Sequence, residues 1–167
     1  MSARVQLRPP TPEDQAEFLE AVRASRTLHH PWTSPPGTAE QFRAYLARVD
    51  QPEHRNFLVC RRGDGRIAGM VNVSNIVRGL FCSAYLGYCV FSGHERQGLM
   101  REGVQAVVRQ AFGPMRLHRL EANIQPGNVA SIALAAACGF AKEGYSPRYL
   151  KIGGRWRDHE RWAVLAS

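Results

Sequence analysis

Apolar and polar residues recur at regular intervals along the first part of the chain, and these intervals predict its secondary structure. Val5 and Leu7 alternate with polar residues as in a short strand, which Pro9-Pro10 would end. The stretch Thr11–Asp14 has the composition of a helix start, with a capping residue, a proline and two acids. Apolar residues at helical spacing continue this helix to Arg26.

A proline-rich stretch, Leu28–Gly37, interrupts the helical pattern, so we expect a loop there. A second amphipathic helix follows, and its apolar positions are Phe42, Tyr45, Leu46 and Val49. Three apolar strands come next, at Phe57–Cys60, Ile67–Ile76 and Ser83–Phe91, with a hairpin turn over Arg61–Gly65. Gly69 is the weak point of the second strand, because it has no side chain to pack.

The second half of the chain alternates helices with strands before it ends in a hairpin. Its predicted elements are a helix over Met100–Phe112, a strand at Arg119–Ile124, a helix from Asn128 to Cys138, and strands at about Phe140–Ile152 and Arg155–Leu165. Gly139 would end the second helix, and Gly153-Gly154 forms a two-residue hairpin turn. This mixed order favours an α+β fold, built as an α/β sandwich.

The size of the chain fits one domain over residues 1–167, and 44% apolar residues can form a core without disulfides or metals. The four cysteines have no CxxC or zinc-like spacing, which favours free thiols, a reducing compartment and no bound metal. The N-terminus lacks the apolar region of a signal peptide, and no run reaches the length of a membrane span. We therefore expect a cytoplasmic protein without a membrane partner.

The net charge of +8 raises the question of an acidic partner. Basic residues are spread along the chain, and Arg61-Arg62 is the only adjacent arginine pair, so no basic tail marks direct nucleic-acid binding. Two explanations stay open. Either the composition favours arginine over lysine and the charge has no function, or the positive electrostatic field of the protein attracts it to an acidic partner such as a ribosome.

The helix that contains Met100–Phe112 begins near Gly98, and this start has the composition of a phosphate-binding site. Helix N-termini attract phosphate through unpaired N–H groups, Gly98 has no Cβ to block the backbone, and Arg96 and Arg101 add positive charge. Taken alone, the same pattern also fits an ordinary tight turn. Asn128 and Ser131 are equally ambiguous, since each could serve only to start a helix.

Together and in this order, these segments resemble the GNAT superfamily of N-acetyltransferases over nearly the whole chain. Residues 95–100, Glu-Arg-Gln-Gly-Leu-Met, are similar to its pyrophosphate loop, usually Arg/Gln-x-x-Gly-x-Gly/Ala. Residues 118–128 resemble its fifth strand with the following turn, and residues 128–140 resemble the helix along the CoA arm. The tail over 143–159 and Leu28-His-His-Pro-Trp32 resemble the ribosomal-protein-alanine N-acetyltransferase (Rim) group.

The resemblance implies a GNAT-like mixed, mostly antiparallel sheet of about seven strands with about four helices. It also implies acetyl-CoA as the acetyl donor, without a metal. The residues that it assigns to this cosubstrate are Cys89, Val90, Arg96, Gln97, Gly98, Leu99, Met100, Arg101, Asn128 and Ser131. Backbone near Cys89 and Val90 would polarise the acetyl carbonyl where two strands splay apart, and Asn128 would hold the pantetheine arm.

The sequence departs from the family pattern in the loop and in the later helix. Glu95 stands where Arg or Gln is usual. Met100 stands where Gly or Ala is usual, so we expect it to pack while its N–H faces phosphate. Ala135 stands where many relatives carry a tyrosine that acts as general acid to the CoA thiolate. By position, Ser131 is the best substitute, as donor of a hydrogen bond to the sulfur.

Glu121 is the first candidate for the general base, directly or through water, although it could be a carboxylate paired with an arginine on a sheet face. His118 and His30 are the other candidates. The pKa of an α-amino group is about 8 and that of lysine about 10.4, so far more of the former is neutral at physiological pH. A site without an obvious strong base therefore suits an N-terminal amine.

We therefore expect acetyl transfer to the N-terminal α-amine of a protein, such as a ribosomal protein, with His30 and Trp32 at the acceptor. Trp32 could instead plug the core. One alternative acceptor is a small amine, such as an aminoglycoside or polyamine, although the chain has only 14 acids to attract a polycation. An alternative of another class is a non-catalytic RNA- or ribosome-binding module, which would need exposed aromatics interleaved with arginine.

Overall fold

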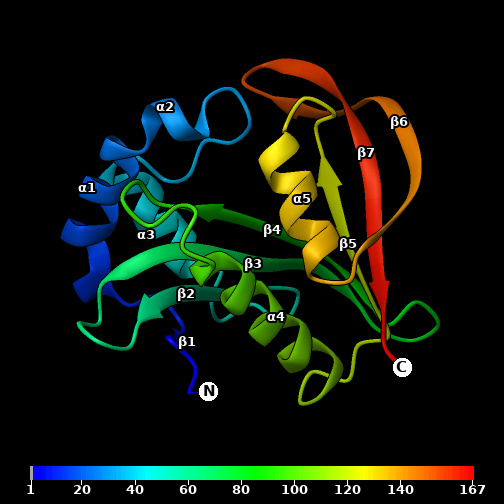
Figure 1. Cartoon of the computed structure of the whole chain (residues 1–167), viewed down its shortest axis with the longest axis horizontal. Coiled ribbons are helices and arrows are strands. Elements are labelled where there is room, and N and C mark those ends of the chain that lie inside the picture. Colours follow the sequence, from blue (N-terminus) through cyan, green and yellow to red (C-terminus); the bar gives the residue numbers. More distant parts are fainter. Residues whose placement is uncertain (1) are drawn as a thin grey trace.

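A seven-stranded sheet with helices on both faces forms the framework of the protein (Figure 1). The computed structural model describes residues 2–167. The strands are β1 (Val5–Arg8), β2 (Arg55–Arg61), β3 (Ile67–Val77), β4 (Ser83–Val90), β5 (Arg119–Ile124), β6 (Ala141–Ile152) and β7 (Arg155–Leu165). The helices are the 3-10 helix η1 (Pro12–Asp14), α1 (Gln15–Ala24), α2 (Arg26–His29), α3 (Ala39–Ala47), α4 (Leu99–Phe112) and α5 (Val129–Ala137).

The strand order is β1-β2-β3-β4-β5-β7-β6, and only the β4–β5 pair is parallel. This confirms the predicted α+β sandwich with a mostly antiparallel, GNAT-like sheet. None of the described helices is long and apolar enough to span a membrane.

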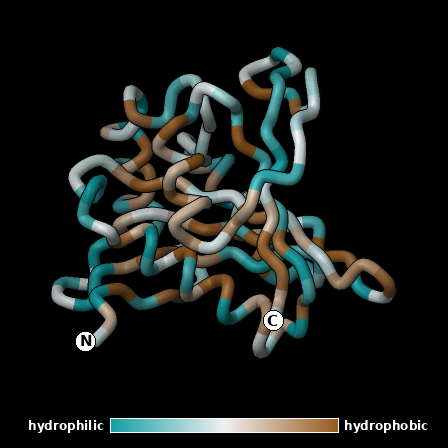
Figure 2. Tube along the Cα trace, turned by 45° about the vertical axis from the view of Figure 1, so that its right-hand side comes forward, coloured by the Kyte–Doolittle hydropathy of each residue, from teal (hydrophilic) through white to brown (hydrophobic). Residues whose placement is uncertain are grey.

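Two hydrophobic cores cover the two faces of the sheet. On one face, Val104 and Val107 of α4 and Ala135 of α5 pack against β2–β5. On the other face, Phe18 of α1 and Phe42 of α3 pack against β2 and β3. The alternation of side chains along each strand separates the two sets, and hydrophobic segments gather in the middle of the sheet (Figure 2). Both faces of the central strands are therefore packed against helices.

The helix predicted to run to Arg26 is divided, and the expected loop begins later than predicted. The polypeptide bends at Ser25, and residues 26–29 form the short helix α2. The Ser25 hydroxyl donates to the Ala21 carbonyl at 2.6 Å and accepts from the N–H of Ser92 at 2.8 Å. Serine that bonds back to the preceding turn bends a helix, and here the contact with Ser92 fixes the bend. Only the folded chain brings Ser92 there.

The other predicted elements are confirmed, with small differences at their ends. The helix start predicted at Thr11–Asp14 is confirmed: the Thr11 N–H donates to the Asp14 carboxylate at 2.8 Å, and Asp14 also pairs with Arg8 at 2.6 Å. Gly153 and Gly154 both have positive φ in the β6–β7 turn.

Gly69, predicted as a weak point of β3, is a packing contact instead. A Cβ there would lie 2.4 Å from Met100 Sδ and 2.5 Å from the Cys89 carbonyl oxygen. The missing side chain therefore lets α4 approach the sheet closely. Gly69 thus sets the spacing between the α4 N-terminus and the sheet.

Candidate active site

Strands β4 and β5 pair over only three residues and then separate. Ser83, Ala84 and Tyr85 face β5, whereas the rest of β4 has no partner on that side (Figure 1). The separation confirms the predicted splay. It leaves backbone groups of β4 open in the middle of the sheet, between one cavity on the α4–α5 face and another on the α3 face.

The larger cavity has a volume of about 570 Å³ and lies between β4, the start of α4 and the start of α5. It brings together most of the residues predicted to bind the cosubstrate. Those that line it are Cys89, Val90, Arg96, Gly98, Leu99, Met100, Arg101, Asn128 and Ser131. The loop and the later helix, about 30 residues apart in the chain, therefore meet in one site.

Gly98 starts α4 in the left-handed conformation, with φ of +75°. This conformation strains any residue with a Cβ, so glycine is required for the turn itself as well as for access to the backbone. The first helical hydrogen bond runs from the Glu102 N–H to the Gly98 carbonyl, at 3.2 Å. The N–H groups of the first three helical residues precede that bond and can bind an anion. The geometry fits a pyrophosphate.

Gln97 is the one residue of the predicted loop outside the lining of the larger cavity. Its side chain donates to the Gly93 carbonyl at 2.9 Å, and its own carbonyl accepts from Arg4. Glu95 also braces this loop, because its carboxylate accepts from the Gly93 N–H at 2.6 Å. Met100 is 6% exposed and packs on Gly69, as expected for a packing residue. The unusual residues of the loop thus hold its shape.

Asn128 caps α5, and its side-chain oxygen accepts from the Ser131 N–H at 3.3 Å. The Ser131 hydroxyl donates to Tyr88 Oη at 3.1 Å, and Tyr88 Oη donates to the Ser131 carbonyl at 2.8 Å. Burial raises the pKa of Tyr88 to about 12. Tyr88 therefore keeps its proton near neutral pH and holds Ser131 at the wall of the larger cavity.

Of the two backbone positions predicted to face the acetyl group, Val90 is the one with its N–H toward the gap. The N–H of Phe91 donates to the carbonyl of Ala68 in β3 at 2.8 Å, and Cys89 is paired with Met70 of β3. Because N–H directions alternate along a strand, the Val90 N–H points away from β3. Cys89 lines both cavities, but its own N–H belongs to the β3 ladder.

The sequence singled out His30, but the structure brings its neighbour His29 into the site. His30 is exposed and lines neither cavity. His29 is 6% exposed, lines the larger cavity, and its Nε2 lies 2.6 Å from the Val90 carbonyl oxygen. This contact holds the open end of β4. In the sequence, His29 differs from His30 only by position, so no signal there separated the two.

Trp32 lines the larger cavity rather than the core. Its ring lies against the turn after β5, where a Cβ on Gly127 would be 3.0 Å from the indole. The Trp32 carbonyl accepts from the Gln125 side chain at 3.3 Å. Trp32 thus joins the loop after α2 to the start of α5.

Glu121 lies on the α3 face of β5 and lines neither cavity. Its carboxylate accepts from Arg119 Nε at 2.7 Å, and Arg119 also pairs with Glu143 at 2.8 Å. This is the arginine-paired arrangement that the sequence left open. Glu121 pairs with Tyr85, the last β4 position before the gap, but its side chain lines neither cavity, so its role as general base stays a prediction.

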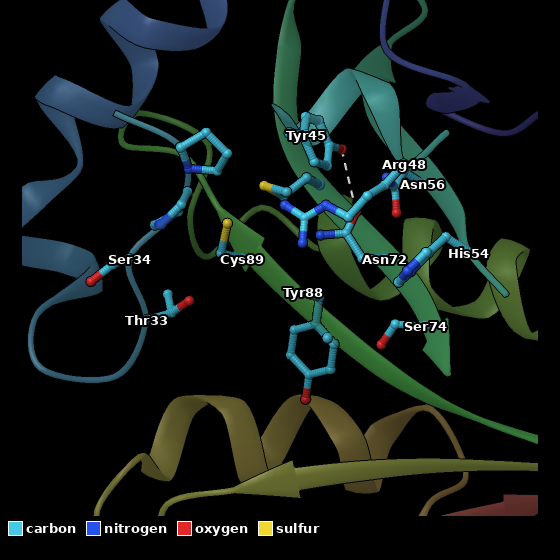
Figure 3. A pocket seen from close by; sticks show the side chains of 14 residues that line it. Thr33, Ser34, Tyr45, Arg48, His54, Asn56, Asn72, Ser74, Tyr88 and Cys89 are labelled. Atoms are coloured by element: carbon cyan, nitrogen blue, oxygen red, sulfur yellow. Dashed lines mark hydrogen bonds between the residues drawn. The ribbon is translucent and has the colours of Figure 1, made fainter. Parts of the chain in front are cut away.

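The smaller cavity, of about 260 Å³, lies on the α3 face of the same gap. Arg48, His54, Asn56 and Asn72 line it, and Tyr88 and Cys89 lie between it and the larger cavity (Figure 3). Sequence analysis missed these polar residues, as well as Tyr88 and His29. A weak signal existed in β2 and β3, because Asn72 interrupts an apolar run of β3 and Asn56 is a polar residue at a buried position of β2.

The sequence model of the acetyltransferase (GNAT) domain family matches residues 4–141. Among curated proteins, "Probable N-acetyltransferase YjcK" of Bacillus subtilis is 35% identical over 129 residues, which cover 77% of this chain and 71% of that protein. The [Ribosomal protein uS5]-alanine N-acetyltransferase of Escherichia coli is 45% identical over 93 residues. That match covers 56% of this chain and about half of the relative, 48%.

Among solved structures, Mycobacterium smegmatis RimJ in complex with CoA-disulfide superposes with a TM-score of 0.89 at 28% identity. The match covers 97% of this chain and 82% of that one. Spermidine N-acetyltransferase from Vibrio cholerae, in complex with CoA and spermine, has a TM-score of 0.80 over 97% of this chain and 95% of that one. At 20% identity, this second likeness concerns the fold alone.

Proposed function

This protein belongs to the GNAT family of acetyl-CoA-dependent acetyltransferases, and from this premise we propose that it acetylates the N-terminal α-amine of a protein, such as a ribosomal protein. The observation that carries the proposal is the gap between β4 and β5, which has a cavity on each face. An acetyl donor and an amine can approach the same backbone segment from opposite sides. A cytoplasmic location fits such an acceptor.

The larger cavity would hold acetyl-CoA. The N–H groups at the start of α4 would bind its pyrophosphate, with Arg96 and Arg101 adding charge. Gln97 supports this loop from behind. Asn128, at the start of α5, would contact the pantetheine arm, which then runs along the open edge of β4 toward Val90.

The acceptor amine would attack the acetyl carbonyl directly, without a covalent enzyme intermediate. The Val90 N–H faces the gap, where it can donate to the carbonyl oxygen as negative charge develops, and His29 holds the adjacent carbonyl. A preorganised donor of this kind lowers a barrier by about 3 kcal/mol. The Ser131 hydroxyl would turn from Tyr88 to the sulfur as thiolate charge develops.

The chemistry of the acceptor supports an α-amine. The pKa of an α-amino group is about 8, so roughly a tenth is neutral at pH 7, whereas well under a thousandth of a lysine with a pKa of about 10.4 is neutral. The lining of the two cavities offers His29, His54 and His94 but no carboxylate other than Glu95, which the Gly93 N–H engages. An α-amine, which is partly neutral in solution, depends less on a general base of the protein than a lysine side chain does. The Escherichia coli relative that is named for ribosomal protein uS5 supports the same acceptor.

A small polyamine is the second candidate acceptor, because spermidine N-acetyltransferases share this fold. A polycation would need several carboxylates in the acceptor cavity, and the smaller cavity is lined by none among the described residues. This observation favours the protein N-terminus.

A competition assay tests the proposal directly. The acceptors are a peptide that begins with Ala or Ser, the same peptide blocked at its N-terminus but carrying lysine, spermidine and kanamycin. We expect the free N-terminus to react fastest. A preference for the blocked peptide, spermidine or kanamycin would refute the proposed acceptor. Calorimetry with CoA is the parallel test of the cosubstrate, and no binding up to about millimolar CoA would refute the assignment of the larger cavity.

A further inference from the structure

We propose that the smaller cavity selects acceptors that carry negative charge next to the reactive amine, such as a protein N-terminus followed closely by Asp or Glu. The inference deepens the proposed function, on which it rests. It names Arg48 and His54 as specificity determinants and Asn56 and Asn72 as binding groups for the acceptor carbonyls.

The floor of the smaller cavity presents hydrogen-bond donors. Asn72 and Asn56 are direct partners in the β2–β3 register, so their amides lie side by side on the α3 face (Figure 3). Tyr45 donates to Asn72 Oδ1 at 3.3 Å, which fixes the orientation of the amide. With its oxygen engaged, Asn72 has its NH₂ group left to donate. A peptide carbonyl is the complementary group.

Arg48 brings a positive charge to the rim of the smaller cavity, and no carboxylate of the described residues lines this cavity. Arg48, at the end of α3, and His54, before β2, both line it. The six ion pairs found in residues 2–167 do not include Arg48, so its guanidinium is available to a ligand. A carboxylate from the acceptor is the group that an unpaired guanidinium binds best. The net charge of +8 acts in the same direction at longer range.

The position of the smaller cavity connects this charge to the reaction. Cys89 lines both cavities, next to Val90, and Gly87 lines the smaller one two residues earlier on the same strand. An amine at the gap would therefore have its following residues over Gly87 and toward Arg48. Gly87 leaves this path open, since a Cβ there would meet no atom within 4 Å.

The test compares two peptides with the same free N-terminal Ala, one followed by Asp-Glu and the other by Lys-Lys. For the wild-type protein we expect kcat/KM to be about fivefold higher for the acidic peptide, from one partly exposed charge pair. Arg48→Gln should remove most of the preference by raising KM for the acidic peptide, and Arg48→Glu should reverse it. Arg43→Gln is the matched control, because Arg43 lies on the same helix but outside the cavity.

Gly87→Leu tests whether the acceptor peptide enters the smaller cavity or is only attracted by the charge at its rim. The Cβ of the new residue meets no atom within 4 Å, and the rest of the leucine side chain extends into the smaller cavity. We therefore expect normal CoA binding by calorimetry and loss of acetylation of both peptides. Retained acidic preference in Arg48→Glu, an equal effect of Arg43→Gln, or full activity of Gly87→Leu would each overturn the inference.

The two proposals fail in different ways. Equal rates for both peptides would overturn the charge selection while the acceptor stays an N-terminal amine. If neither peptide reacts, the proposed acceptor is wrong. In that case, acetylation of a small amine that carries a carboxylate, reduced in Arg48→Glu, would still support the inference, whereas acetylation of spermidine would overturn both.

Discussion

Tyr88→Phe is the most informative single change, because it removes one hydroxyl and leaves the ring in place. That hydroxyl donates to the Ser131 carbonyl at 2.8 Å and accepts from Ser131 Oγ at 3.1 Å. Its loss should lower the free energy of unfolding by about 0.5–1.5 kcal/mol, the usual net contribution of a hydrogen bond. In catalysis, a misplaced Ser131 that costs about 1.4 kcal/mol of thiolate stabilisation would lower kcat about tenfold.

The assay is steady-state kinetics for Tyr88→Phe, Ser131→Ala and the double variant. We expect kcat to fall with little change in the KM for acetyl-CoA, and the double variant to be no slower than Ser131→Ala, because both changes remove one coupled pair. The pKa of Tyr88 is raised to about 12, so the effect should be constant from about pH 6 to about pH 9.

Tyr85→Phe is the matched control. It removes the same group from the same strand, but Tyr85 lines neither cavity. If Ser131→Ala lowers kcat and Tyr88→Phe does not, Tyr88 does not position the serine. If neither change lowers kcat, the role of Ser131 itself is refuted.

Three further predictions follow from the same structure. Asn128→Ala should raise the KM for acetyl-CoA more than it lowers kcat and cost about 1 kcal/mol of stability as a lost helix cap; the opposite kinetic split would contradict the assignment. Gly98→Ala should weaken CoA binding in calorimetry and strain the backbone by about 1–2 kcal/mol, because φ is +75°; unchanged affinity would argue against the pyrophosphate site. Burial opposes ionisation of Asp14, but hydrogen bonds from Arg8 and Thr11 outweigh it and lower the pKa of Asp14. The stability that this carboxylate contributes is therefore present above pH about 4 and lost as the pH falls through its folded pKa. Asp14→Asn should reduce the loss of unfolding free energy at acid pH, measured by urea titrations at several pH values. An unchanged loss in the variant would show that Asp14 is not its origin.

Local patterns predicted most of the secondary structure because the signals are short in range. The strand at Arg119–Ile124 and the hairpin around Gly153 match the structure, since alternation and turn chemistry involve residues close in sequence. The helix start at Gly98 was predicted for the same reason. Ser25 shows the limit, because its bend depends on Ser92, a residue 67 positions away.

The sequence by itself determined the elements, the family and the loop that would bind phosphate, since each is written in neighbouring residues. Only the tertiary structure decided which polar side chains face the reaction. The gap between β4 and β5 arises from strand pairing, so the positions of His29, Tyr88 and Arg48 beside it could not be inferred from spacing. A neighbouring position on a helix or strand turns a side chain to another face, and His30 therefore points away while His29 reaches Val90.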